Sequence, residues 1–274
     1  MLCAHMKDLD GKTFLITGAN SGIGRVAATE LARRGAHVII AGRSREKTQP
    51  VLDELGASAE FVELDLGDLA SVRRCAEALR GRTIDVLINN AGLAGHRGTT
   101  KDGFELQFGT NHLGHYLLTR LLADQIGDRV VNVASASHYG AKGIDWEAVR
   151  KRTRSTTGYP EYEVSKLANV LFTKELARRV PRLKTYAVHP GTVATDVWRR
   201  VPSPVAWVMK KFMLSPDEGA RSMLKAATDP ALASDSGHYY NQRGEERRPS
   251  KLADDVELAR TLWAKSAEWT GLAG

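Results

Sequence analysis

The chain is poor in cysteine and contains no long apolar segment. Its 274 residues include two cysteines, Cys3 and Cys75, which are too few for a disulfide framework or a cysteine-based metal site. Cys75 falls in a helical run, and we expect it to be packed rather than reactive. A membrane-spanning stretch of about 20 apolar residues and a signal-peptide pattern are both missing, so we expect a cytoplasmic protein without a transmembrane segment.

Basic residues exceed acidic residues, at 39 Lys and Arg against 32 Asp and Glu, for a net charge of +7. Such a surplus can indicate binding to nucleic acid or to an acidic membrane. The basic residues are spread from Arg33-Arg34 to Arg247-Arg248, without an aromatic stacking platform or a known nucleic-acid module. We therefore expect no nucleic-acid partner.

Apolar runs alternate with stretches of helical periodicity along the whole chain, and no linker divides it. This alternation predicts α/β architecture: a single Rossmann-type, doubly wound domain over residues 1–274, with a seven-stranded parallel sheet and helices on both faces. The ligand crevice should lie at the carboxyl ends of the strands. The predicted strands are 13–17, 37–41, 61–64, 84–88, 130–134, 185–188 and 238–240. The predicted helices lie near 22–34, 45–55, 69–80, 101–126, 159–179, 216–228 and 252–269.

The segment Tyr-Glu-Val-Ser-Lys, residues 162–166, places a phenol beside a cation. Residues four apart in a helix share one face, so Tyr162 and Lys166 should be neighbours. A nearby ammonium favours the phenolate, which would bring the tyrosine pKa from about 10 toward neutral pH. The pair predicts a phenol that exchanges protons, although the same short pattern also occurs where both side chains are merely exposed.

A second motif, Thr-Gly-Ala-Asn-Ser-Gly-Ile-Gly, occupies residues 17–24 directly after an apolar run. Glycines at 18, 22 and 24 would let the backbone turn tightly and approach a pyrophosphate, whose charge would lie at the positive end of the following helix. Glycine-rich turns also join strands to helices without any ligand, but the flanking strand and helix favour dinucleotide binding.

Together the two motifs resemble the short-chain dehydrogenase/reductase family, and the similarity runs nearly end to end. Asn-Asn-Ala-Gly at 89–92, Asp65 after a strand, and Pro-Gly-x-x-x-Thr at 190–195 match further family elements. The resemblance implies four catalytic residues, Asn111, Ser135, Tyr162 and Lys166. It also implies cofactor contacts at Gly18, Asn20, Ser21, Gly22, Ile23, Gly24, Asp65, Leu66, Asn90, Ala91, Gly92, Tyr162, Lys166, Pro190, Gly191, Val193 and Thr195.

The family's reaction is hydride transfer between the nicotinamide and a carbonyl or alcohol carbon. By this resemblance Tyr162 donates or accepts the proton, and Ser135 binds the substrate oxygen. Lys166 lowers the Tyr162 pKa and binds the nicotinamide ribose. Asn111 bends its helix and holds a water that connects Lys166 to solvent.

Within the family, the chain is most similar to the retinol dehydrogenase-like branch. Asn-His-Leu-Gly-His at 111–115, Ser-Lys-Leu-Ala-Asn-Val-Leu-Phe-Thr at 165–173 and Val-His-Pro-Gly-Thr-Val at 188–193 carry this similarity. One departure concerns the catalytic serine, because Ala134-Ser135 stands where the branch usually has Ser-Ser. Ser137 is a weaker second candidate.

The end of the second predicted strand bears on cofactor choice. An NAD-selective site places Asp or Glu there to bond the ribose 2′-hydroxyl. Here the strand ends in Ala-Gly-Arg, with Gly42 at the acidic position and Arg43 next to it. Arg43 can stack on adenine and hold a 2′-phosphate, with Arg25 assisting from the first helix, so we predict NADP(H) as cofactor.

The predicted substrate loop, about 192–214, suggests a bulky hydrophobic carbonyl or alcohol: a retinoid, steroid, aliphatic aldehyde or polyketide ketone. Its apolar residues could equally form a homo-oligomer surface or a peripheral membrane contact. His112, His115 and His138 lack the spacing of a metal site, so no metal is expected. His189 should be a strand-end residue near the cofactor.

Two other functions compete with the reductase reading. A sensor or scaffold could bind NADP(H) without turnover, but such proteins usually lose the catalytic tyrosine or lysine, and this chain keeps both. A C=C reductase similar to the light-dependent protochlorophyllide reductases would use additional cysteines near its active site, which two cysteines at 3 and 75 fit poorly.

Overall fold

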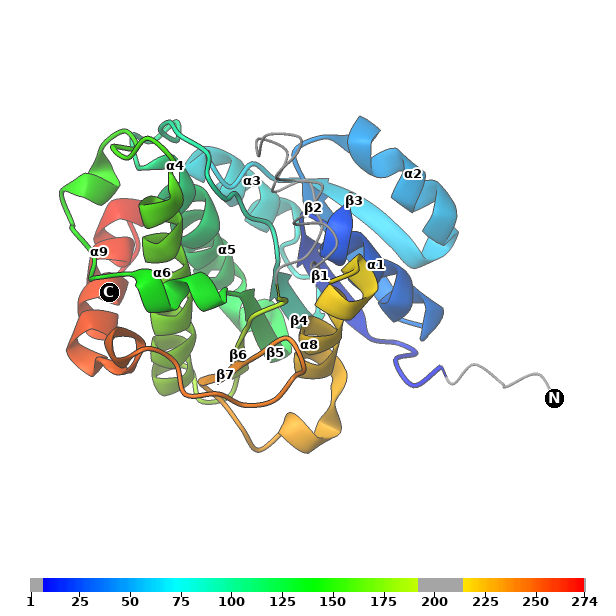
Figure 1. Cartoon of the computed structure of the whole chain (residues 1–274). Coiled ribbons are helices and arrows are strands. Elements are labelled where there is room, and N and C mark those ends of the chain that lie inside the picture. Colours follow the sequence, from blue (N-terminus) through cyan, green and yellow to red (C-terminus); the bar gives the residue numbers. More distant parts are fainter. Residues whose placement is uncertain (1–6, 192–213, 274) are drawn as a thin grey trace.

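A central parallel sheet organises the chain, as the computed structural model shows for residues 7–191 and 214–273 (Figure 1). Its seven strands run in the order β3-β2-β1-β4-β5-β6-β7, and every neighbouring pair is parallel. The strands are β1 (Thr13–Thr17), β2 (His37–Gly42), β3 (Ala59–Glu63), β4 (Ile84–Asn89), β5 (Ile126–Val133), β6 (Lys184–Val188) and β7 (His238–Tyr240).

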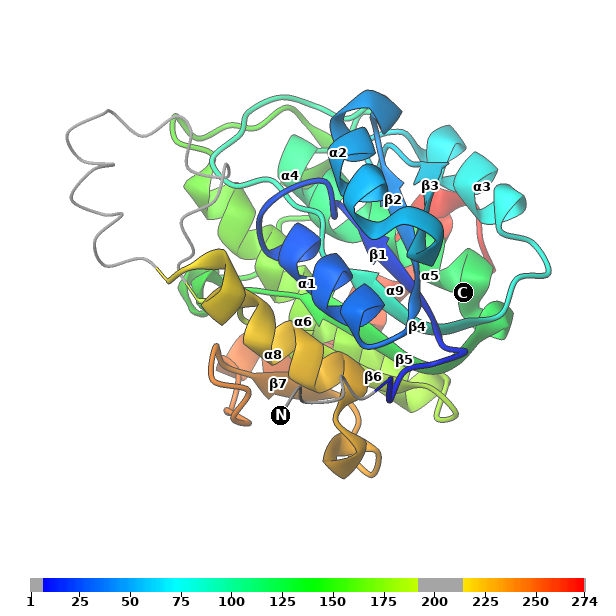
Figure 2. The same cartoon turned by 90° about the vertical axis from the view of Figure 1, so that its right-hand side faces the viewer.

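Helices cover both faces of the sheet (Figures 1 and 2). One face carries α1 (Gly22–Arg33), α2 (Arg45–Leu55) and α8 (Pro216–Thr228). The other carries α3 (Leu69–Ala78), α5 (Gly114–Leu122) and α6 (Tyr159–Arg179), with α9 (Val256–Thr270) packed against α6. Strands buried on both sides must be apolar throughout, as Phe-Leu-Ile in β1 illustrates. The predicted fold class is confirmed.

The direction of strand order reverses between β1 and β4, which are hydrogen-bonded neighbours. In such sheets the loops leaving the two strands diverge to opposite faces and leave a crevice at the carboxyl ends. The glycine turn follows β1 and the Asn-Asn-Ala-Gly segment follows β4, so both lie at this crevice.

Several helix ends differ from the bounds predicted from the sequence. The predicted helix 101–126 is shorter and irregular: it starts with a single turn, α4 (Leu106–Phe108), continues as a π-helical segment (Gly109–Leu113) and ends with α5 at Leu122. Glu105 stops it from starting earlier, because its side chain caps the N–H groups of Gln107 and Phe108. The last helix begins at Val256 instead of 252, after the capping Asp255.

The predicted substrate loop lies outside the described residues, apart from Leu214, and so do Val193 and Thr195. Among the helices of residues 7–191 and 214–273, none has the length and apolar character needed to cross a bilayer.

Candidate active site

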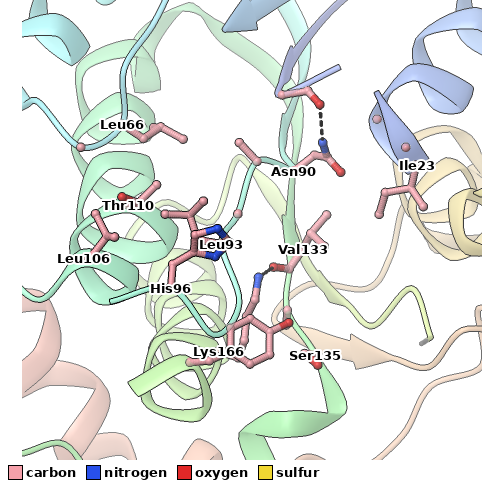
Figure 3. Close-up of a pocket in the computed structure, with 18 of the residues that line it drawn as sticks. Ile23, Leu66, Asn90, Leu93, His96, Leu106, Thr110, Val133, Ser135 and Lys166 are labelled. Atoms are coloured by element: carbon pink, nitrogen blue, oxygen red, sulfur yellow. Dashed lines mark hydrogen bonds between the residues drawn. The ribbon is translucent and has the colours of Figure 1, made fainter. Parts of the chain in front are cut away.

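A cleft of about 1090 Å³ lies at the carboxyl ends of the strands and brings the predicted site residues together. All the predicted cofactor residues that the structure describes line it, from Gly18 in the glycine turn to Gly191 after β6. Ser135 lines the cleft as well, whereas Asn111 is fully buried and does not line it. Figure 3 shows Ser135 and Lys166 on one side of this cleft and Asn90 and Ile23 on another.

The glycine turn is packed so tightly that side chains would not fit. Gly18 has φ +70°, and a Cβ there would lie 2.9 Å from the Cβ of Ala91. A Cβ on Gly24 would lie 2.5 Å from Nδ2 of Asn90. The first turn of α1 contains no acidic residue, and the Ser21 side chain makes no capping bond. The positive end of α1 therefore fits the pyrophosphate of a dinucleotide.

A buried hydrogen-bond network ties the floor of the cleft to Asn111. Thr17 Oγ1 accepts from the backbone N–H groups of Asn90 and Ala91, both at 3.0 Å. The Thr17 hydroxyl lies 2.9 Å from Nε2 of His115, whose Nδ1 lies 3.0 Å from the carbonyl oxygen of Asn111. Burial lowers the His115 pKa to about 4, so the ring is neutral near pH 7: Nδ1–H donates to Asn111, and Nε2 accepts from Thr17.

Asn111 lies in the π-helical segment and bridges the loop after β4 and helix α6. Its Oδ1 accepts from the Leu93 N–H at 2.8 Å, and its Nδ2 donates to the Leu93 carbonyl at 2.9 Å and to Ser165 Oγ at 2.9 Å. Helix irregularities of this kind often occur at functional sites. The helix is thus irregular at the residue where the family resemblance implied a bend.

Ser135, Tyr162 and Lys166 converge from β5 and α6. Lys166 Nζ donates to the carbonyl oxygen of Val133 at 2.8 Å (Figure 3) and lies 5.6 Å from the Tyr162 ring centroid. Burial lowers the Lys166 pKa to about 8. Burial also raises the Tyr162 pKa to about 12, against the opposing effect of a hydrogen bond with Ser135.

This direction differs from the sequence prediction that Lys166 lowers the Tyr162 pKa. In the described chain, loss of hydration around the phenol outweighs the stabilisation of the phenolate. A lysine whose own pKa has fallen is also less fully charged at neutral pH. The prediction considered the charge of Lys166 but not the burial of both partners.

The end of β2 is basic where it meets the cleft. Arg43 is exposed, forms no hydrogen bond or ion pair with the rest of the described chain, and lines the cleft together with Lys47 from the first turn of α2. Sequence reasoning missed Lys47, whose position in that first turn was a usable signal. Arg25, which we expected to assist, pairs with Glu54 at 2.6 Å and does not line the cleft in this structure.

Other lining residues were also missed, among them Leu93, His96, Tyr159 and Glu163. Tyr159 precedes Tyr162 by three residues in α6, a spacing that places both on one helix face and could have identified it. His189 lines the cleft beside Pro190, as predicted. Cys75 is buried and its pKa is raised to about 12, which confirms a packed thiol.

Comparison with known proteins agrees with this geometry. The family model described as short chain dehydrogenase matches residues 12–205. The chain belongs to the short-chain dehydrogenase family. It is 38% identical to human retinol dehydrogenase 13, over 98% of this chain and 88% of that protein. It is 37% identical to mouse polyprenol dehydrogenase, over 96% of this chain and 85% of that protein. The resemblance to the retinol dehydrogenase-like branch is confirmed.

Solved structures of short-chain dehydrogenases share the fold. An uncharacterized protein from Mycobacterium paratuberculosis has a TM-score of 0.81 and 39% identity, with 96% of this chain and 95% of that chain covered. A 3-ketoacyl-(acyl-carrier-protein) reductase from Brucella melitensis, complexed with NADH, has a TM-score of 0.67 and 27% identity, with 85% and 97% covered. Family membership therefore implies a nicotinamide cofactor.

Proposed function

We propose that the protein is an NADP(H)-dependent oxidoreductase that interconverts a carbonyl and an alcohol on a bulky hydrophobic substrate. The observation that carries this proposal is the convergence, in one cleft, of Ser135, Tyr162 and Lys166 with the glycine turn and the basic end of β2. Bound NADP(H) would supply the hydride. The protein supplies binding, orientation and proton transfer.

The phenol of Tyr162 gives its proton to the substrate oxygen during reduction and accepts one during oxidation. Its raised pKa keeps the Tyr162 phenol of the free enzyme protonated near neutral pH, which suits proton donation during reduction. Ser135 bonds the same oxygen and stabilises negative charge as it develops. Lys166, fixed by the Val133 carbonyl, binds the cofactor ribose, and its position between Tyr162 and Gly92 supports that role.

The preference for NADP(H) rests on charge at the end of β2. Arg43 and Lys47 bring two cations to the cleft, and β2 itself ends in Gly42 without a carboxylate. A 2′-phosphate would bond these cations, whereas a free ribose hydroxyl would lack the acidic acceptor of an NAD-selective site. Asp65 lines the cleft further on, where its Oδ1 accepts from the Gly67 N–H at 3.0 Å.

The substrate class rests on the relatives, which are named retinol and polyprenol dehydrogenases. Steroids, aliphatic aldehydes and polyketide ketones likewise combine an apolar body with a carbonyl or alcohol group, and they complete the proposed class. A cytoplasmic location remains part of the proposal, in keeping with a chain whose two cysteines form no disulfide pattern.

Turnover of hydrophobic carbonyls tests this function. NADPH oxidation at 340 nm would be followed with retinal, a steroid ketone, a long aliphatic aldehyde and a polyketide-like ketone, in parallel with NADH. The proposal predicts turnover of at least one of these with NADPH preferred. Tight NADPH binding without turnover of any carbonyl would favour a non-catalytic sensor.

A further inference from the structure

Three hydroxyl groups form a chain along the wall of the cleft, starting at the proposed catalytic serine. Ser135 Oγ donates to Ser137 Oγ at 3.2 Å, and Ser137 Oγ lies 2.9 Å from the hydroxyl of Tyr159. Ser135, Ser137 and Tyr159 all line the cleft, as Tyr162 does. Tyr159 stands at the outer end of the chain, with 40% of its surface exposed.

Both ends of this row of hydroxyl groups belong to regular elements of the fold. Ser135 caps the short 3-10 helix Ala136–Gly140, and its Oγ accepts from the Ser137 N–H at 3.1 Å. Tyr159 is the first residue of α6, and its ring centroid lies 5.9 Å from that of Tyr162. The preceding Gly158 carbonyl accepts from Gln107 Nε2 at 2.5 Å, which anchors the start of the helix.

Each hydroxyl has one hydrogen, so the direction of the chain matters. When Ser135 donates to Ser137, its only hydrogen is used in that bond and cannot be donated to a substrate oxygen. When Tyr159 donates to Ser137 and Ser137 donates to Ser135, the Ser135 hydrogen is free to meet that oxygen. The two arrangements differ only by rotation of three hydroxyl groups, and no covalent bond forms or breaks.

We propose that Ser137 and Tyr159 are positioning residues that turn the Ser135 hydroxyl toward the substrate oxygen during the reaction. This inference rests on the proposed function. Donation along the chain polarises each hydroxyl in turn and strengthens the last donor. The negative charge that develops on the substrate oxygen favours the arrangement in which Ser135 donates.

Two substitutions isolate the hydroxyl groups from the rest of the structure. Ser137→Ala keeps the backbone N–H that bonds Ser135 Oγ, so the 3-10 turn is retained. Tyr159→Phe keeps the ring beside Tyr162. Tyr139→Phe is the matched control, because Tyr139 is also exposed but donates to the Arg248 carbonyl and does not line the cleft.

The test is steady-state kinetics with NADPH and a turned-over carbonyl, together with the NADPH Kd, for the full-length variants. Loss of one neutral hydrogen bond predicts a kcat lower by roughly 2- to 10-fold for Tyr159→Phe and Ser137→Ala, with KM and NADPH Kd little changed. The double variant should be no slower than Ser137→Ala alone, since both act through Ser135. Ser137→Thr should restore kcat, and Tyr139→Phe should match the wild type.

Wild-type kcat in both single variants would overturn the inference. So would additive losses in the double variant, which would mean that Tyr159 acts independently of Ser137. A wild-type enzyme that turns over no carbonyl would overturn the proposed function itself, and this inference with it.

Discussion

Lys166 donates from Nζ to the carbonyl oxygen of Val133, the last residue of β5, over 2.8 Å. This bond joins α6 to the strand that leads into Ser135, two residues further on. It therefore sets the spacing between the serine and the Tyr162 ring, which lies 5.6 Å from the same Nζ. The lysine thus contributes both a charge and the geometry of the site.

Lys166→Met should lower turnover by roughly 10²-fold or more and weaken NADPH binding, because the ribose contact and the orientation of Tyr162 are lost together. The fold should survive, since Asn169 Nδ2 also donates to the Val133 carbonyl, at 3.3 Å. Lys174→Met is a control on the same helix, whose lysine pairs with Asp254 outside the cleft. A Lys166→Met enzyme with near-wild-type kcat and NADPH affinity would show that the lysine is only structural.

The proposed preference for NADP(H) predicts that cofactor selectivity depends on Arg43. Arg43→Asp should raise the NADPH Kd by roughly 10- to 100-fold, the value of a lost charge-assisted bond, and shift the preference toward NADH. Arg45→Asp is a control two residues further along the chain, at the start of α2, because Arg45 lies over the Phe61 ring, 5.7 Å from its centroid, and does not line the cleft. Fluorescence titration with both cofactors measures the ratio, and an unchanged ratio in Arg43→Asp would reject the proposed 2′-phosphate contact.

Stability should fall in acid because histidines are buried in the neutral form. Burial lowers the His112 pKa from 6.5 to about 3, so below pH 6.5 the unfolded chain binds a proton that the folded chain does not. The stabilisation is present above pH 6.5 and is lost as pH falls toward 3, by roughly 3 kcal/mol at pH 4 for this one group. His115 and His189 act in the same direction.

His112→Phe isolates this contribution. The ring packs between Phe108 and Phe172, with centroids 5.1 and 5.9 Å away, so phenylalanine should fit the site. Tm measured from pH 7 to pH 4 should fall less steeply in His112→Phe than in the wild type. Parallel Tm curves for the two proteins would mean that His112 takes up its proton over the same pH range in the folded and the unfolded chain, and that its pKa is not lowered by burial.

The fold and most of the cleft could be predicted from the sequence because both depend on local patterns. β1 and α6 have the predicted bounds, since an apolar run ending at a glycine and a long helical periodicity leave little choice. The π-helical segment around Asn111 could not be predicted from periodicity, because it differs from an α-helix only in hydrogen bonds that span one residue more.

Burial and contacts between distant segments could not be predicted from the sequence either, because they depend on the whole fold. The burial of Tyr162 and Lys166, which reverses the expected direction of the Tyr162 pKa, is a property of packing. The pairing of Arg25 with Glu54 joins α1 to α2 although the two residues are 29 positions apart in the sequence. The hydroxyl chain from Ser135 to Tyr159 joins two segments separated by more than twenty residues, so no short motif contains it.

Tyr162→Phe removes one oxygen atom and leaves the ring in place, so it separates proton transfer by Tyr162 from the packing of its side chain. The measurement is NADPH oxidation at 340 nm with a carbonyl that the wild type reduces, together with the NADPH Kd of each protein. We expect a kcat lower by roughly 10²- to 10⁴-fold with the NADPH Kd within a few-fold of wild type. A Tyr162→Phe enzyme that reduces the carbonyl at the wild-type rate would contradict the assignment of Tyr162 as proton donor.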